Sequence, residues 1–168
     1  MNEPGRAFKE NPFVPVELEL AIDGVGPMFG GEPTEHRPDA MEFARGHYEQ
    51  HHRARGELVL DGARFAIDGY GLRDHSWGPR SWQAPAYYRW LTANGGSDWG
   101  FMLSRIARPD GPGTRGGFVW DEGTLHLCND AELSTTWQGD DAYHRAIDFT
   151  LRSGDRHWHG RGKVLNLI

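Results

Sequence analysis

Short turn signals divide the apolar stretches of this sequence at intervals, and this feature most constrains the fold. Asp61-Gly62 is a two-residue hairpin signal, because such residues tolerate the positive φ angles of a tight turn. Longer signals follow at Asn94-Gly95-Gly96, Asp121-Glu122-Gly123 and Ser153-Gly154-Asp155. Apolar and polar residues alternate between many of these turns, as in half-buried strands. The pattern predicts a series of antiparallel hairpins.

The predicted strands follow one another along the chain with little room for helix. No window of eleven or more residues combines a 3.6-residue period with helix caps. The predicted strands are 14–22, 43–60 (one long strand, or two with a bend at Gly56), 63–72, 86–93, 98–107, 117–120, 124–135, 143–151 and 157–168; the connections 23–40, 73–85 and 109–117 separate some of them. About nine sequential strands form an all-β antiparallel meander, which closes into a barrel or bends strongly to protect its edges.

The length and composition limit the class of protein. A chain of 168 residues fits one core, which we place in residues 42–168, after an N-terminal arm, strand and Gly/Pro-rich loop in 1–41. The net charge of -6 argues against nucleic acid as a partner. One cysteine, Cys128, allows no internal disulfide and favours a cytoplasmic location. No apolar stretch approaches the roughly 20 residues that span a bilayer, so we expect no membrane span.

The segment from Arg73 to Trp82 is rich in charged, titratable and aromatic side chains. It places an acid and an imidazole, Asp74 and His75, among arginines and tryptophans. A carboxylate beside an imidazole is sufficient for general acid–base chemistry near neutral pH. The same residues also fit a purely structural role, in which ion pairs pin a loop and tryptophans close the end of a barrel. Both interpretations remain open from the sequence.

A second polar cluster, residues 46–53, falls within the long predicted strand. If this strand is regular, His47, Glu49 and His51 share one face, and Tyr48 and Gln50 share the other. Tyr48 and Gln50 would give polar contacts inside an apolar cavity, unless this face is solvated.

The sequence gives less support to a metal site or to a nucleophilic cysteine. His47 with His51, and His157 with His159, each offer two nitrogens, but the sequence fixes no third ligand, so no metal site is predicted. Cys128 has apolar neighbours at alternate positions and is interpreted as a small buried residue.

The residues named above carry a family resemblance. His47-Tyr-Glu-Gln50, Gly56, Asp61-Gly62 and the segment Gly69-Tyr-Gly-Leu-Arg-Asp-His-Ser-Trp-Gly-Pro-Arg-Ser-Trp82 resemble the lipocalin-like superfamily of carotenoid 1,2-hydratases (hydroxyneurosporene synthases) and AttH-type proteins. The resemblance runs from about residue 42 to the end of the chain. It is nearest to a bacterial branch with the Arg-Asp-His-Ser-Trp-Gly-x-Arg signature. It implies a lipocalin-like (calycin-like) barrel or bent sheet.

The resemblance also implies a function. Characterised relatives add water to, or protonate, a carbon–carbon double bond of an isoprenoid or prenylated substrate, without a redox cofactor. Carried onto this chain, it implies catalysis by Asp74 and His75, and an apolar ligand (terpenoid, steroid-like or polyketide) contacted by Tyr48, Gln50, Arg73, Trp77, Arg80 and Trp82. A non-catalytic carrier of such a ligand is the alternative, and a structural half-domain is a further one.

The resemblance further implies two such domains in tandem, and this chain has about half that length. The apolar run at residues 164–168 also favours a missing second domain or a partner subunit, because chain ends are usually polar. We therefore expect either a fragment that lacks a second lipocalin-like domain or a homodimer.

Overall fold

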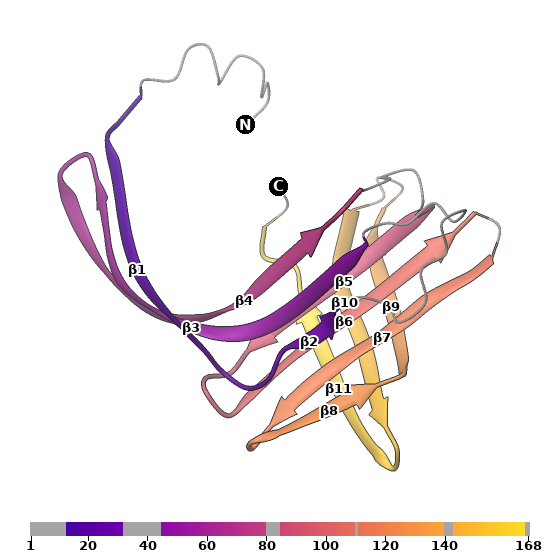
Figure 1. The fold of residues 1–168 in the computed structure, drawn as a ribbon. Helices are drawn as coiled ribbons and strands as arrows, with labels where there is room; N and C mark the ends of the chain where they lie inside the picture. Colours follow the sequence, from indigo (N-terminus) through magenta and orange to yellow (C-terminus); the bar gives the residue numbers. More distant parts are fainter. Residues whose placement is uncertain (1–12, 32–44, 80–84, 110, 140–142, 167–168) are drawn as a thin grey trace.

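The structure is a computed structural model, and it describes residues 13–31, 45–79, 85–109, 111–139 and 143–166 (Figure 1). These residues form strands and turns without any helix, which confirms the predicted all-β antiparallel class. The strands are β1 (Val16–Gly24), β2 (Phe29–Gly31), β3 (Gly46–Leu60), β4 (Ala63–Trp77), β5 (Tyr87–Asn94), β6 (Trp99–Arg108), β7 (Gly111–Asp121), β8 (Thr124–Cys128), β9 (Asp130–Gln138), β10 (Tyr143–Ser153) and β11 (Arg156–Lys163).

The strands form three antiparallel sheets. In the first sheet, β3 pairs with β4 along its full length, and with β1 and β2 along its other edge. The middle sheet has the order β5-β6-β7-β8, and the third sheet has the order β11-β10-β9. All four predicted turn signals lie in hairpin connections, at β3–β4, β5–β6, β7–β8 and β10–β11.

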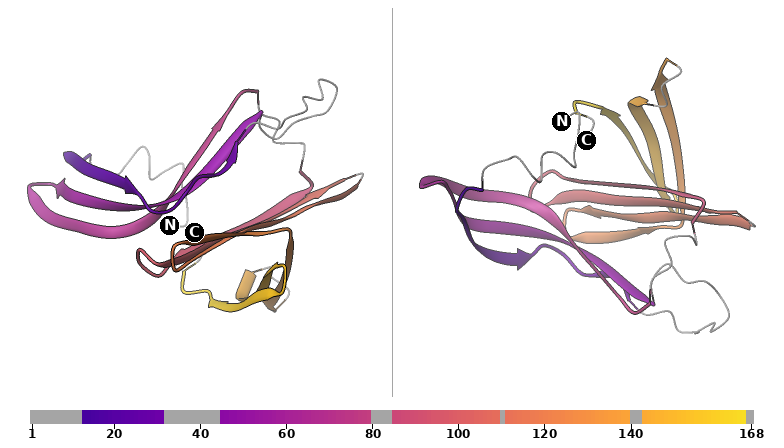
Figure 2. Two further views of the ribbon diagram at one scale, coloured as in Figure 1. Left: turned by 60° about the horizontal axis from the view of Figure 1, so that its bottom comes forward. Right: turned by 90° about the horizontal axis from the view of Figure 1, so that it is seen from above.

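The middle sheet lies between the other two, as Figure 2 shows. Its side toward the third sheet carries the main core, because Phe101, Leu103 and Val119 pack there with Ala131 and Leu151. Its other side meets the first sheet. There Phe118 contacts both Phe29 and His51, with ring centroids 5.1 Å apart in each pair.

The first sheet is strongly bent and does not close into a barrel. In Figures 1 and 2, β3 and β4 curve along their length, and the convex side of the bend lies against the middle sheet. The side chains that contact the middle sheet, such as His51, therefore belong to the convex face. The opposite, concave face points away from the middle sheet. Of the two predicted shapes, the strongly bent sheet is the one observed.

Some predicted element boundaries are wrong. Residues 73–77, expected in a connection, extend β4 as far as Trp77 because the β3–β4 ladder continues to Gly46. Residues 111–117, expected in a turn, belong to β7, which pairs with β6 despite its glycines. The predicted strand 124–135 divides at Asn129, where the chain passes from the middle sheet to the third. Phe29–Gly31, expected in a loop, pairs with β3 as β2.

The described part of the chain has no helix long and apolar enough to cross a membrane.

Candidate functional site

The β3–β4 hairpin displays the chemistry-rich residues on two different faces. Residues directly opposite one another in an antiparallel ladder project from the same side of the sheet. Tyr48 is opposite His75, and Gly46 is opposite Trp77. Glu49 is opposite Asp74, one position along the ladder, and so projects from the other side. Because side chains alternate along a strand, Asp74 and His75 lie on opposite faces of the first sheet.

An aromatic and cationic cluster occupies one end of the concave face. The His75 ring lies 5.5 Å from Tyr48 and 5.5 Å from Trp77, measured between centroids. The Arg73 guanidinium lies over the Tyr48 ring, 5.2 Å from its centroid. An amphipathic group of this kind suits the polar end of a ligand whose remainder is apolar.

Beyond Gln50 and His52, apolar side chains lie on the concave face toward the far end of β1, β3 and β4. The register places Leu18 opposite Leu58, and Leu58 opposite Phe65, so one apolar row crosses three strands. Leu18 is 58% exposed and Phe65 is 50% exposed. The apolar residues of this face, together called the concave patch, are Val16, Leu18, Leu20, Ile22, Leu58, Leu60, Phe65 and Ile67.

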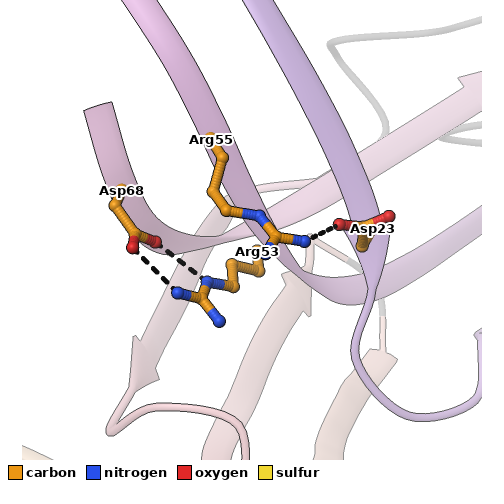
Figure 3. Close-up of polar contacts among 4 residues, drawn as sticks. All are labelled: Asp23, Arg53, Arg55 and Asp68. Atoms are coloured by element: carbon orange, nitrogen blue, oxygen red, sulfur yellow. Dashed lines mark hydrogen bonds and ion pairs between the residues drawn. The ribbon is translucent and has the colours of Figure 1, made fainter. Parts of the chain in front are cut away.

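Ion pairs cover the convex side of the same region, as Figure 3 shows. Arg53 donates two hydrogen bonds to Asp68, at 2.9 and 2.8 Å, and Arg55 donates one to Asp23 at 2.6 Å. A sheet with one charged face and one apolar face normally buries the apolar face. The concave patch thus resembles the uncovered half of an apolar core or ligand site.

A cluster of two acids and a histidine, with only Glu49 buried, lies on the convex face where it meets the middle sheet. The His47 Nε2 atom lies 2.7 Å from Asp74 Oδ1 and 3.7 Å from Glu49 Oε1. The indole N–H of Trp90, on β5, donates a hydrogen bond of 2.6 Å to Glu49 Oε1. Three strands of two sheets thus converge on the Glu49 carboxylate.

Glu49 is the most unusual member of this cluster. Its side chain is only 1% exposed, and no hydrogen-bond partner for Oε2 exists among the residues that the structure describes. Burial raises the pKa of Glu49, because an ionised carboxylate loses solvation there; the Trp90 hydrogen bond opposes this shift. His47 and Asp74 remain about half exposed, so solvent reaches the cluster from one side.

His51 lies deeper in the same interface. Its side chain packs against Phe118 and leaves no room for a side chain at Gly100. Burial lowers the pKa of His51, because the charged imidazolium would lose solvation. His51 is therefore a core residue of the contact between the two sheets.

The structure distributes the predicted site residues over both faces. Tyr48, Arg73, His75 and Trp77 lie together on the concave face, and Asp74 lies on the convex face with His47. Gln50 donates a hydrogen bond of 2.9 Å to the Gly26 carbonyl, which anchors the β1–β2 connection. Arg80 and Trp82 lie outside the described residues.

Sequence reasoning did not select Glu49 and Trp90 as site residues. The alternation of His47 and Glu49 on one strand was a usable signal for a shared face. No sequence pattern, however, showed that Trp90 of another sheet would bury the Glu49 carboxylate.

A separate open groove lies on the middle sheet beside β2. Its volume is about 300 Å³, and Phe29, Met102, Leu127 and Cys128 contribute to its walls. Experiments on ligand binding must distinguish this groove from the concave face.

The fold and these sites define a layered, all-β protein with one open, apolar sheet face and one acid cluster built around the buried Glu49. The chain belongs to the family described as a domain of unknown function (DUF7064), whose sequence profile matches residues 7–168. No curated protein and no solved structure matches the chain. The resemblance to carotenoid hydratases and AttH-type proteins therefore stays a prediction.

Proposed function

We propose that this protein binds an apolar small molecule, of terpenoid, steroid-like or polyketide size, on the concave face of the first sheet. The observation that carries the proposal is the juxtaposition of the concave patch with the Tyr48, Arg73, His75 and Trp77 cluster on one bent surface. A contiguous apolar surface of this kind marks a ligand or partner site in soluble proteins.

The two ends of the concave face would have different tasks. Apolar side chains such as Leu18 and Phe65 would contact the hydrocarbon part of the ligand. Arg73 and His75 would contact a hydroxyl, carbonyl or carboxylate at its other end, because both can donate hydrogen bonds. Gly69 adds to the available space, since no atom of the described residues lies within 4 Å of the position that its Cβ would occupy.

The test is saturation binding of the neutral apolar fluorophore N-phenyl-1-naphthylamine to the purified chain. We expect saturable binding that Leu18→Glu and Phe65→Glu each weaken by at least about tenfold, since a buried charge costs more than 1.4 kcal/mol. Tyr143→Glu, a substitution of an exposed aromatic residue of the third sheet, is the matched control and should leave the affinity unchanged.

Leu127→Glu separates the concave face from the groove beside β2. If Leu127→Glu abolishes binding while Phe65→Glu does not, the ligand occupies the groove and the proposal is wrong. Absence of saturable binding to the unmodified chain would also contradict it.

Hydration or isomerisation of a carbon–carbon double bond is the second candidate function. His75 favours it, because an imidazole between two aromatic rings on the ligand face could deliver a proton to a bound alkene. Asp74 faces the other side of the sheet, so the proposed acid on this face is His75. The test is incubation of the chain with prenylated alkenes in water labelled with oxygen-18. Labelled product that is lost in His75→Gln but kept in His144→Gln supports this second function. Absence of any product contradicts it.

A cover for the concave face is part of the proposal. An open sheet would leave one side of an apolar ligand in water, whereas small-molecule sites bury most of the ligand surface. A second copy of this chain, or a second lipocalin-like domain, would supply the cover. Sedimentation velocity distinguishes these two covers. A dimer of the unmodified chain that Leu18→Glu converts to a monomer indicates that a second copy is the cover. A monomer at high concentration contradicts a second copy as the cover.

A further inference from the structure

We infer that His47, Glu49 and Asp74 form a binding site for one divalent transition-metal ion, with Zn2+ as the best-suited member of this class. The site lies on the convex face of the first sheet, on the opposite side from the proposed ligand face. It does not depend on the proposed function.

The geometry of the three side chains is that of a preformed chelate. One donor atom from each residue lies within 4.8 Å of the other two. His47 and Glu49 are two positions apart on β3, and Asp74 is opposite Glu49 on β4. All three therefore project from one side of a continuous ladder, which holds their backbones in place without a ligand.

The buried carboxylate is the second, independent observation. Glu49 is 1% exposed, and its Oε2 atom has no hydrogen-bond partner in the described part of the chain. A buried carboxylate oxygen without a partner is costly, and a cation would lower that cost. Trp90 holds the other oxygen, Oε1, at 2.6 Å, which is how ligating carboxylates are commonly oriented.

The charge of the cluster points to a divalent cation. Two carboxylates converge on one imidazole, and no lysine or arginine forms an ion pair with either carboxylate within the described ranges. One divalent cation would balance the two negative charges. His47 and Asp74 are 43% and 48% exposed, so an ion can enter from solvent while Glu49 lies at the bottom of the site.

The donor set selects the kind of metal. One imidazole nitrogen with carboxylate oxygens suits Zn2+ and neighbouring first-row ions, whereas Mg2+ and Ca2+ prefer oxygen ligands alone. Three protein ligands also leave at least one coordination position open to water or another small ligand.

The experiment is a calorimetric titration with Zn2+ of the metal-free chain of 168 residues. The unmodified chain is compared with four variants. We expect one Zn2+ per chain, with affinity weakened at least about tenfold in His47→Ala, Glu49→Gln and Asp74→Asn, a loss typical even of outer metal-site residues. Asp68→Asn is the control, because Asp68 is an acid on the same face of β4 that pairs with Arg53 instead. It should bind Zn2+ as the unmodified chain does.

Glu49→Gln keeps the inference testable if another variant fails to fold. Glutamine retains the side-chain volume and the acceptor for Trp90, and urea unfolding monitors its stability. X-ray absorption of the Zn2+-loaded chain should show a single imidazole with oxygen donors at about 2.0–2.2 Å. Two imidazoles would place the ion at His157 and His159, whose rings lie 5.3 Å apart. That result, absence of stoichiometric binding, or unchanged affinity in Glu49→Gln and Asp74→Asn would overturn the inference.

Discussion

Glu49 and Asp74 are directly opposite each other in the β3–β4 ladder, and both carboxylates approach the His47 imidazole from the same side of the sheet. His75 follows Asp74 in the chain but faces the other side, with Tyr48 and Trp77. One hairpin therefore supplies two chemically different surfaces. The acid cluster, with Glu49 buried and Asp74 about half exposed, lies beside the middle sheet, and the aromatic cluster belongs to the open concave face.

Two strand glycines of the same hairpin should respond in opposite ways to alanine. A Cβ atom at Gly56 would overlap the Glu19 carbonyl of the neighbouring β1, whereas a Cβ atom at Gly69 would meet nothing within 4 Å in the part of the chain that the structure describes. We expect Gly56→Ala to lower the free energy of unfolding by about 1–3 kcal/mol, the usual cost of overpacking. Gly69→Ala should raise it by about 0.5–1 kcal/mol, because alanine loses less conformational entropy. Urea unfolding measures both, and equal effects would contradict the assigned β1–β3 register.

The contact between the middle and third sheets should contribute much of the stability. Leu103 is fully buried there, so Leu103→Ala should lower the free energy of unfolding by about 2–5 kcal/mol. Leu127 is the control, because it is 53% exposed and projects from the other face of the middle sheet. Leu127→Ala should change the free energy of unfolding by no more than about 0.5 kcal/mol. A small effect at Leu103 would mean that the two sheets do not pack as described.

Local signals in the sequence were sufficient to predict the hairpins. The turn at Asp61-Gly62 is observed where expected, and both residues have positive φ angles of 50° and 80°. The strand ends were harder to predict, because they depend on partners far along the chain. Residues 73–77 contain an acid, a base and a tryptophan in a polar sequence, yet they form a strand because β3 continues opposite them.

The division of the site between two faces was only partly predictable. Alternation along β3 correctly separates His47, Glu49 and His51 from Tyr48 and Gln50. Which of these faces becomes buried depends on Trp90 and Phe118 of the middle sheet, and period-two alternation carries no information about that contact. The sequence therefore predicted the concave aromatic residues as a site but did not identify Glu49.

The ion pair between Arg53 and Asp68 should make a small, pH-dependent contribution to stability. Its two hydrogen bonds lower the pKa of Asp68 below that of the unfolded chain, so the folded state prefers the ionised carboxylate. This stabilisation is present above the unfolded pKa of about 3.9 and is lost as the pH falls through the folded value.

The midpoint of urea unfolding, followed from pH 7 to pH 3, tests this assignment. The difference between the unmodified chain and Asp68→Asn should shrink as the pH falls below about 4. Asp148→Asn is the control, because the contact of Asp148 with Arg161 is longer, at 3.5 Å. A difference for Asp68→Asn that is constant with pH would mean that the side chain acts through packing alone.

Cys128 should be almost unreactive in the folded protein. It is buried in the core between the middle and third sheets, and burial raises the pKa of its thiol to about 11. At pH 8 only roughly one folded molecule in a thousand then carries the reactive thiolate, compared with about a quarter of unfolded molecules. Labelling with Ellman's reagent should therefore be at least about 100-fold slower in buffer than in 8 M urea.

The same pKa shift of Cys128 predicts how the free energy of unfolding depends on pH in the alkaline range. Between the unfolded pKa of about 8.5 and the folded value, the unfolded chain loses the thiol proton while the folded chain keeps it. Stability should therefore fall as the pH rises through this range, and Cys128→Ala should remove this part of the slope while lowering stability at every pH through lost packing. The urea midpoint between pH 8 and pH 10.5 measures the slope. Two results would contradict this prediction: rapid labelling of the folded chain, and the same dependence of stability on pH in the unmodified chain and in Cys128→Ala. Together they would show that Cys128 is accessible to solvent and that the core contact at β8 opens.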